Sequence, residues 1–415
     1  MILYSLHPLS MDKPGKSEFF ILFLREILKT VSISNRLRSP LIMPPALSGT
    51  QRLINRAVIP AVRQAAAMPG TAFRPETINF LDNAGIRLSI TQDLRPKALA
   101  DARINEGISN FDALFGTRGR HLAGREIVNW NLATPHSIPD AQTTLHVIYL
   151  YDKEGASGDK DIKMNLCDPD DTLSYIANGY SLLYRFIKGR GFPGVSFHVG
   201  YSSPRVQRLD YTDENGRSNH IQVPVPGGDT LDESSLMSRM TQCLEHFKAN
   251  LRASGFNGFI AAENNNFETW NGLNAYEHIT SPEFIGGLAD ATSLDLLLDT
   301  SHLMVACGNK WKTDPADYVE KLLRGRRDRL KEVHLSVPSV RSGNADNRFM
   351  DSHSSFYDTL GTGTLTNKTL EILFDIVRNK RTGQPLILNF ETDIETAALD
   401  AVAVVTYLQA MDLAK

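Results

Sequence analysis

An aspartate and a histidine stand three residues apart at the end of the most apolar segment of the sequence. Within DLLLDTSHLMVACGN, residues 295–309, a run of leucines leads directly to Asp299 and His302. Burying a carboxylate is costly unless a cation or hydrogen-bond donors compensate its charge. Carboxylate and imidazole groups are together typical ligands of iron, manganese and zinc. The pair therefore predicts a metal site in which the two side chains bind adjacent ions.

Further histidines, aspartates and glutamates occupy similar positions, at or just beyond the end of a β-rich segment. Each of them alone is as readily a buried structural residue as a ligand, but five of the eleven histidines fall in this one set. Nine ligands are more than one four- to six-coordinate ion can use, so we predict two or three metal ions. The candidate metal ligands are His146, His198, Glu263, Asp299, His302, His334, Asp351, His353 and Glu391.

Two groups of these candidates have distinct expected roles. Glu263, Asp299 and Glu391 are predicted to bridge neighbouring ions, because a carboxylate has two oxygens to offer. Asp351 and His353, in MDSH at residues 350–353, are expected to lie in a loop that closes over the metals. Loops at the ends of strands are where functional residues concentrate.

The elements that must position these residues repeat one pattern, a short β-rich segment followed by a turn and a helical period. Eight alternating units predict a (β/α)₈ barrel, whose functional residues come from the carboxyl ends of the strands. A doubly wound open sheet is the alternative, but GIRLSITQDLRP lacks the glycine loop that binds phosphate there. The predicted strands are 85–90, 125–131, 143–152, 194–201, 256–264, 294–302, 330–337 and 385–393. The clearest predicted helices are 172–188, 231–251, 281–291, 314–324 and 368–379. The second has Asp232 near its start, and the third has Ser281 as N-cap and Pro282 at its first position.

Composition narrows the possible functions. The chain has 415 residues, 42% of them hydrophobic, and a formal net charge of −3, so it can bury a large core but has no excess of basic residues for nucleic acid. Its three cysteines indicate neither a disulfide framework nor a cysteine zinc site, and a cytoplasmic location is expected.

The N-terminal region differs from the rest of the chain. FFILFL at residues 19–24 is bracketed by charged residues and is far shorter than the roughly 20 residues of a membrane span, so no membrane association is expected. We predict that residues 1–75 are an extension, in part helical or disordered. Residues 76–415 are predicted to form the catalytic barrel.

Six motifs resemble those of a known family. VSFHVGYSS, AAENNNFETW, LLLDTSHLMVACGN, EVHLSV, MDSH and LNFETD, in this order within roughly residues 84–395, are similar to motifs of the multinuclear non-heme iron-dependent oxidative enzymes. That family includes the methanobactin-maturation oxygenase and has xylose-isomerase-like barrels. The nine candidate ligands and Asn264 match its motif positions.

The resemblance implies a specific activity. It implies two or three irons of mixed valence, with dioxygen as co-substrate, that oxidise a residue, commonly cysteine, of a ribosomally made precursor peptide. A small partner protein that captures the peptide leader is also implied. Glu263, Asp299 and His302 would be the catalytic residues.

The sequence departs from the family pattern at two places. The first predicted strand is followed by ITQDLRP, where the family usually has a PPHY-like turn. Residues 152–171 look like an insertion between His146 and His198. His146 is therefore the ligand that the resemblance supports least. Many uncharacterised relatives have asparagine at the place of His302, so the histidine here points to the peptide-modifying branch.

The sequence is compatible with three other classes of function. A divalent-metal sugar isomerase or epimerase could share the barrel and some ligands, but it usually has a catalytic lysine near the metal and no predicted strand ends in one. An endonuclease IV-like zinc phosphodiesterase could use a similar ligand set, but the chain lacks a basic, aromatic strand-binding loop. A non-enzymatic binding module explains the nine ligands least well.

Overall fold

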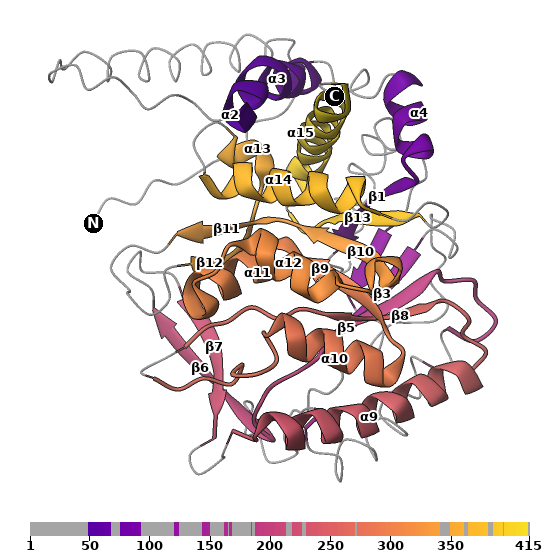
Figure 1. Cartoon of the computed structure of the whole chain (residues 1–415), viewed down its shortest axis with the longest axis vertical. Helices are drawn as coiled ribbons and strands as arrows, with labels where there is room; N and C mark the ends of the chain where they lie inside the picture. The colour runs from indigo at the N-terminus through magenta and orange to yellow at the C-terminus, as the bar shows by residue number, and fades with distance from the viewer. Residues whose placement is uncertain are drawn as a thin grey trace, which may run out of the picture. The chain divides into compact units, whose positions relative to one another are not determined.

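Eight parallel strands form a closed barrel in the computed structural model (Figure 1). The barrel closes because β1 pairs with two neighbours, and its Ile90 lies opposite both Arg120 and Phe390. This closure confirms the predicted (β/α)₈ barrel and excludes the doubly wound sheet. In chain order around the barrel, the strands are β1 (Ile86–Gln92), β2 (Arg120–Ala123), β3 (Thr143–Tyr149), β5 (Gly194–His198), β8 (Phe259–Glu263), β9 (Asp295–Asp299), β10 (Leu330–Leu335) and β13 (Leu386–Phe390).

The structure describes most of the barrel and its helices. Three sequence predictions lie wholly or mostly outside the described residues: the apolar stretch 19–24, the strand 125–131 and the helix 172–188. The second barrel strand that is described, β2, precedes the predicted one. The described residues are 49–67, 75–92, 120–123, 143–149, 162–164, 166–167, 184, 187–212, 218–225, 230–269, 272–340, 349–360, 364–380, 385–392 and 394–413.

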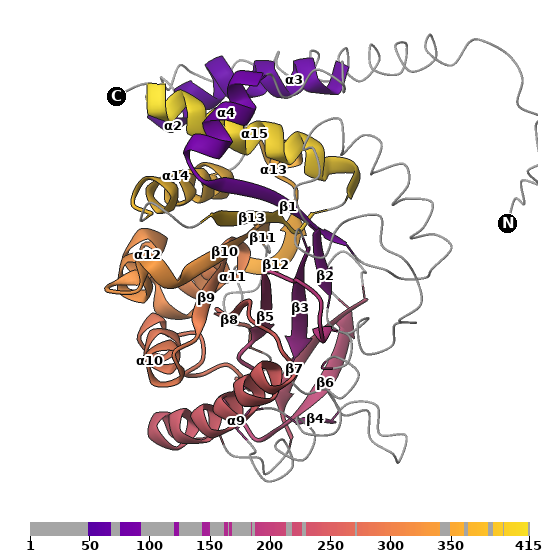
Figure 2. The same cartoon turned by 90° about the vertical axis from the view of Figure 1, so that its right-hand side faces the viewer.

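The helices that cover the barrel begin where their capping residues predict. Asp232 caps α9 by accepting a hydrogen bond from the Ser235 amide, and Ser281 caps α10 in the same way, with Pro282 following it. Figure 2 shows α14, α12, α10 and α9 in sequence along one side of the barrel. The bounds of these and the later helices are α9 (Glu233–Ala253), α10 (Pro282–Thr292), α11 (Thr300–Ala306), η4 (Cys307–Trp311), α12 (Pro315–Leu323), η5 (Arg327–Arg329), α13 (Phe356–Thr359), α14 (Thr364–Arg378) and α15 (Ile394–Leu413). No helix in the described ranges is apolar over a length that could cross a bilayer.

Short helices before the first strand pack against the C-terminal helix α15. These are α2 (Gly49–Leu53), η1 (Ile54–Val58), α3 (Ile59–Ala67) and α4 (Pro75–Asn83). Ile54, Val58 and Val62 are buried in the same core cluster as Tyr407 and Leu408 of α15. The segment 49–67 lies within the predicted N-terminal extension, yet it belongs to the compact unit Ser48–Lys415 that contains the barrel.

Two small antiparallel sheets follow barrel strands. One consists of β4 (Ile162–Met164), β6 (Arg205–Thr212) and β7 (Ser218–Pro224), and β6 begins shortly after the end of β5. The other is a hairpin of β11 (Val337–Val340) and β12 (Phe349–Ser354), which follows β10. Both sheets therefore start at the carboxyl end of the barrel, where the site is expected.

Alternation along the strands directs apolar and polar side chains to opposite faces. In β9, Leu296 and Leu298 belong to the core between strands and helices, while Asp299 does not. In β10, Val333 and Leu335 belong to that core, while His334 lies on the other face. Because side chains alternate with a period of two, the polar residues at these strand ends point into the barrel.

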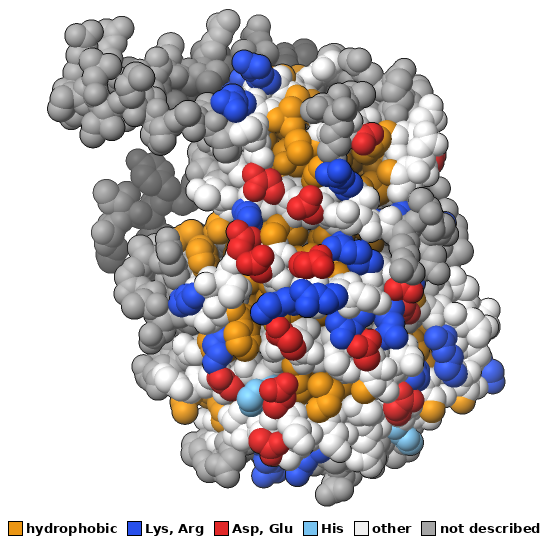
Figure 3. Space-filling model, viewed as in Figure 1, with side chains coloured by type: hydrophobic (Ala, Val, Ile, Leu, Met, Phe, Trp, Pro, Cys, Tyr) orange, Lys and Arg blue, Asp and Glu red, His pale blue; other side chains and the backbone are white. Residues whose placement is uncertain are grey.

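The helical surface in Figure 3 carries both signs of charge side by side. Lys321 lies 3.1 Å from Glu283, and Arg326 lies 2.6 Å from Asp290, so these pairs connect α12 and the segment after it to α10. Exposed pairs of this kind stabilise a fold by about 0 to 1 kcal/mol each. This face has no large patch of a single sign.

Candidate metal centre

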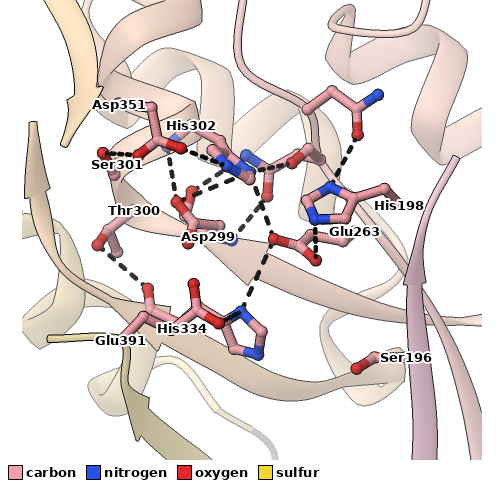
Figure 4. A network of polar contacts seen from close by, with 12 residues as sticks. Ser196, His198, Glu263, Asp299, Thr300, Ser301, His302, His334, Asp351 and Glu391 are labelled. Carbon is pink, nitrogen blue, oxygen red and sulfur yellow. Dashed lines mark hydrogen bonds and ion pairs between the residues drawn. The ribbon is translucent and has the colours of Figure 1, made fainter. Parts of the chain in front are cut away.

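The structure brings all nine candidate ligands together at the carboxyl end of the barrel. Five of them lie at the end of a barrel strand or next to it, a sixth lies in the middle of β3, and most of the set is drawn in Figure 4. The other three come from α11 and from the hairpin strand β12. Eight strands that end in one place are the reason why residues far apart in sequence meet here. The six residues on or next to barrel strands are His146 (within β3), His198 (β5), Glu263 (β8), Asp299 (β9), His334 (β10) and Glu391, the residue after β13.

Glu263 lies at the centre of the group and contacts four imidazoles. Its Oε2 is 3.4 Å from Nε2 of His146 and 3.6 Å from Nε2 of His198. Its Oε1 is 3.3 Å from Nδ1 of His302 and 3.7 Å from Nδ1 of His334. The side chain is 1% exposed. A carboxylate with one oxygen toward each pair of histidines has the geometry of a bridging ligand.

The electrostatics of Glu263 agree with this central place. Burial alone would raise the pKa of its carboxyl group, but His198, His146 and His334 outweigh burial and lower it. Burial also lowers the pKa of His198, against the attraction of Glu263. The carboxylate is therefore ionised, and His198 has a neutral nitrogen to offer to a cation.

Asp299 and His302 are joined by a helix cap rather than by a loop. The strand predicted over 294–302 ends at Asp299, and His302 lies in the first turn of α11, which corrects its predicted place on a strand. Oδ1 of Asp299 accepts a hydrogen bond of 2.6 Å from the His302 amide. N-cap aspartate is favoured because it satisfies an otherwise unbonded helix amide. The Asp-x-x-His spacing thus directs both side chains to the barrel mouth.

The other oxygen of Asp299 points to a role beyond capping. Oδ2 is buried and accepts no hydrogen bond from any described residue. Burial raises the pKa of Asp299 to about 7, although His302 acts in the opposite direction. Asn264 fixes the backbone here, because its side chain accepts from the Asp299 amide at 2.7 Å and donates to the Asp299 carbonyl at 3.0 Å.

Asp351 and His353 lie on the strand β12, which corrects the prediction that they belong to a loop. Oδ2 of Asp351 is 3.0 Å from Nε2 of His302 and 3.3 Å from Nε2 of His353. Its Oδ1 accepts a hydrogen bond of 2.7 Å from Ser301. The hairpin therefore places a carboxylate between a helix histidine and a strand histidine.

Glu391 links the inner and outer parts of the group. Its Oε1 is 3.1 Å from Nδ1 of His334, and its Oε2 is 3.5 Å from Nδ1 of His353. His334 is fully buried, whereas the side chain of His353 is 44% exposed. The ligand set thus extends from the barrel interior to solvent, and His353 is the member that an incoming substrate would meet first.

Several residues hold the histidines in place, and the sequence did not single them out. Ser196 Oγ lies 3.0 Å from Nδ1 of His146, and Asn265 Oδ1 lies 3.3 Å from Nδ1 of His198. In each ring the other nitrogen, Nε2, is directed to Glu263. A histidine that ligates a metal usually has its second nitrogen bonded in this way.

Glu332 is a further residue that sequence reasoning missed. It is fully buried on β10, two residues before His334, and its Oε1 lies 3.5 Å from Nε2 of that histidine and accepts a hydrogen bond of 3.2 Å from Thr144. The period of two in a strand could have identified it, because Glu332 and His334 must share a face.

The group fits divalent or trivalent metal ions. Two triads each have ligand atoms within 4.8 Å of one another, and they share Glu263. The buried oxygens Glu263 Oε2 and Asp299 Oδ2 accept no hydrogen bond from described residues, and a cation would satisfy both. Nitrogen and carboxylate donors suit iron, manganese or zinc. The triads are His146, His198 and Glu263, and Glu263, Asp299 and His334.

Comparisons with known proteins give similarity at the level of architecture. No protein-family model matches the sequence, and no curated protein matches it. The barrel is similar to 3-keto-D-glucoside 4-epimerase of E. coli (14% identity, TM-score 0.41, 77% of this chain and 98% of that chain covered). It is also similar to endonuclease IV of Thermus thermophilus (16%, 0.41, 78% and 99%) and to mannonate dehydratase of Streptococcus suis (12%, 0.46, 79% and 94%). At these values the similarity says nothing about the reaction of this chain.

Proposed function

We propose that this chain is an enzyme that holds two or three iron ions at the mouth of its barrel and uses dioxygen to oxidise a residue of a ribosomally made peptide, with cysteine as the expected target. The observation that carries the proposal is the contact of Glu263 with four histidines, all within 3.7 Å. One carboxylate between two pairs of nitrogen donors is an arrangement for more than one ion.

The donor set supports iron within this proposal. Five histidines and four carboxylates surround the site, and the three cysteines lie outside the two triads. Neutral nitrogens beside bridging carboxylates suit an ion that changes oxidation state. Bound iron would supply redox chemistry with dioxygen and would lower the pKa of a coordinated thiol.

The candidate ligands are proposed to have different roles according to their position in the site. Glu263, Asp299 and His302 are proposed as catalytic, because Glu263 and Asp299 belong to the buried triads and His302 contacts both Glu263 and Asp351. Asp351 and His353 form the outer edge, where a substrate thiol can approach from solvent. The peptide substrate and a small leader-binding partner are supported by the resemblance of the ordered motifs and by nothing else.

A sugar isomerase or epimerase with one divalent ion is the second candidate. Glu263, Asp299 and His334 have ligand atoms within 4.8 Å of one another, and Glu391 lies 3.1 Å from His334. Such a carboxylate-rich set suits a single manganese or magnesium ion. It leaves five further candidate ligands without a function, which is why we place it second: His146, His198, His302, Asp351 and His353.

One set of measurements separates the candidates. The protein is purified without chelators, its metals are determined by elemental analysis, and it is incubated, with and without air, with short cysteine-containing peptides that genes near its own are found to encode. Iron above one equivalent, oxygen uptake and a change in peptide mass that requires air are expected. Manganese or magnesium with no oxygen uptake would favour the epimerase. Zinc alone, with phosphodiester cleavage in the absence of air, would favour an endonuclease IV-like enzyme.

A further inference from the structure

Asp400 is a buried carboxylate that is not among the proposed metal ligands. It lies on α15 and is fully buried. Its Oδ1 accepts hydrogen bonds from the hydroxyl of Ser355 at 2.6 Å and from the amide of Tyr357 at 2.8 Å. Its Oδ2 accepts a hydrogen bond from the hydroxyl of Thr392 at 2.7 Å. Three short hydrogen bonds to one buried carboxylate form a rigid junction.

The partners of Asp400 belong to the two segments that supply the outer ligands. Thr392 directly follows Glu391 at the end of β13. Ser355 is two residues after His353, at the point where β12 gives way to α13. These two segments are far apart in sequence, and the carboxylate of Asp400 connects them through one side chain.

The backbone of His353 shows why such a connection is needed. Its φ is 45°, in the left-handed region that a residue with a side chain rarely adopts. A conformation of this kind persists only where the surroundings hold it. Ser355 is held by Asp400 and also caps α13 by accepting from the Asp358 amide. Asp400 thus holds the chain just beyond the strained residue.

We infer that Asp400 is a positioning residue for the outer metal position, because it fixes the spacing between His353 and Glu391. Oε2 of Glu391 is 3.5 Å from Nδ1 of His353, and among the described hydrogen bonds only those of Asp400 tie both ligand segments to α15. Without Asp400, the spacing between the two ligand segments would be held less tightly. Ligands must be held within about 0.5 Å for a site to bind its ion well.

The inference rests on the proposed metal centre but not on the identity of the reaction. It predicts a selective effect. Loss of Asp400 weakens binding of the outermost ion, while the ions held by Glu263, Asp299 and the inner histidines keep their affinity. A general loss of stability would instead weaken all of them or none.

The test is an anaerobic calorimetric titration of the metal-free protein with iron(II). It is carried out on wild type, Asp400→Ala and Asp400→Asn. We expect Asp400→Ala to weaken one class of iron site at least about tenfold and to leave the others within about threefold. Asp400→Asn should be close to wild type, because the amide oxygen still accepts from Ser355 and Tyr357 and the Thr392 hydroxyl can turn to accept from the amide.

Val404→Ala is the matched control, because Val404 is fully buried one turn further along α15 and its apolar side chain forms no hydrogen bond with either ligand segment. It should lower the melting temperature without changing iron affinity. If Asp400→Ala does not fold, Thr392→Val removes one of the three bonds and should weaken the same class of site by a smaller factor.

The outcomes distinguish this inference from the proposed function. Wild-type protein that binds no iron would overturn the metal centre and the inference together. Wild-type binding with an unchanged Asp400→Ala or Thr392→Val isotherm would overturn the inference alone. Equal weakening by Val404→Ala would also overturn it, because the effect would then come from stability and not from position.

Discussion

Nε2 of His302 lies 3.0 Å from Oδ2 of Asp351, so that the first turn of α11 meets the hairpin strand β12 across the barrel mouth. The neighbouring Ser301 donates to the other oxygen of the same carboxylate at 2.7 Å. Two consecutive residues of one helix therefore set both the position and the orientation of Asp351. This relationship makes the outer part of the ligand set depend on the inner part.

Ser301→Ala tests that dependence. The Asp351 carboxylate would lose the donor that fixes its rotation, and loss of such an outer hydrogen bond typically costs 10- to 100-fold in metal affinity. We expect the outermost iron to bind about tenfold more weakly in anaerobic titration, with the fold intact. Ser235→Ala removes a hydroxyl that donates to Asp232, the cap residue of α9 and not a candidate ligand, and should not change iron binding. Unchanged binding by Ser301→Ala would mean that Asp351 needs no such support.

Glu263→Gln tests the bridging role. The amide cannot hold two cations, so we expect most of the iron to be lost, as measured by elemental analysis. Glu332→Gln is the matched control, since Glu332 is equally buried and contacts His334 but is not one of the nine candidate ligands. It should weaken iron binding by about 10- to 100-fold without abolishing it. Equal metal content in Glu263→Gln and wild type would remove the basis for a shared ligand.

Metal binding should release protons and should strengthen as the pH rises. Burial disfavours the imidazolium forms of His302 and His334, but Asp299 with Asp351 and Glu391 with Glu263 outweigh burial and raise the pKa of each histidine well above its ordinary value. Both rings are therefore protonated at neutral pH in the metal-free protein, and a cation must displace these protons. Calorimetry in buffers of different ionisation enthalpy measures the number released, and we expect about two from these rings.

The same shifts give the sign of the stability change in the metal-free protein. A histidine with a raised folded pKa contributes stability that is full below its unfolded pKa and is lost as the pH rises through the folded value. The metal-free protein should therefore lose stability as the pH rises above the ordinary histidine pKa of about 6.5 toward the raised pKa values of these two rings, while the iron-loaded protein should not. The gap between their melting temperatures should widen with pH. A gap that narrows would show that these rings are neutral before metal binds.

His353→Ala tests the outermost ligand by itself. Its side chain is 44% exposed, so its loss leaves no buried cavity and should change the melting temperature of the metal-free protein little. We expect one iron equivalent fewer and lower oxygen uptake. Unfolding of this variant, with unchanged iron content in whatever remains folded, would indicate a structural role.

Much of the architecture could be predicted from local chemistry. Asp232 and Ser281 predicted helix starts that the structure confirms, because a cap is decided by residues within one turn. The convergence of His198, Glu263 and Asp299 followed from counting strands, since parallel strands of a barrel end at one rim. These inferences need only sequence order and periodicity.

Other features depend on contacts that sequence order does not contain. Ser196 supports His146 from the neighbouring strand, and that pairing depends on the register in which β3 and β5 align. The strand β12 forms only because β11 pairs with it, and its polar sequence resembles a loop. The helical place of His302 could have been predicted from the sequence, because Asp299 three residues earlier is a recognisable N-cap. The predicted strand was instead extended to residue 302.

Gly308→Ala tests how the hairpin is docked on the barrel. A methyl group at Gly308 would overlap the ring of Phe349, the first residue of β12. That ring cannot move freely with its backbone, because the Phe349 amide donates to Asn309 at 2.9 Å and its carbonyl accepts from Asn309 at 2.8 Å. Overpacking of this kind typically costs about 1 to 3 kcal/mol. We therefore expect β12 to shift together with Asp351, two residues further along, and the outermost iron to bind more weakly while the inner iron remains.

Gly287→Ala, on α10 and with an ordinary contact to Met237 at 3.4 Å, should leave iron binding unchanged. Iron titration and melting temperature measure both effects. A destabilised Gly308→Ala with normal iron binding would show that the Phe349 ring turns aside and that the hairpin keeps its place without it.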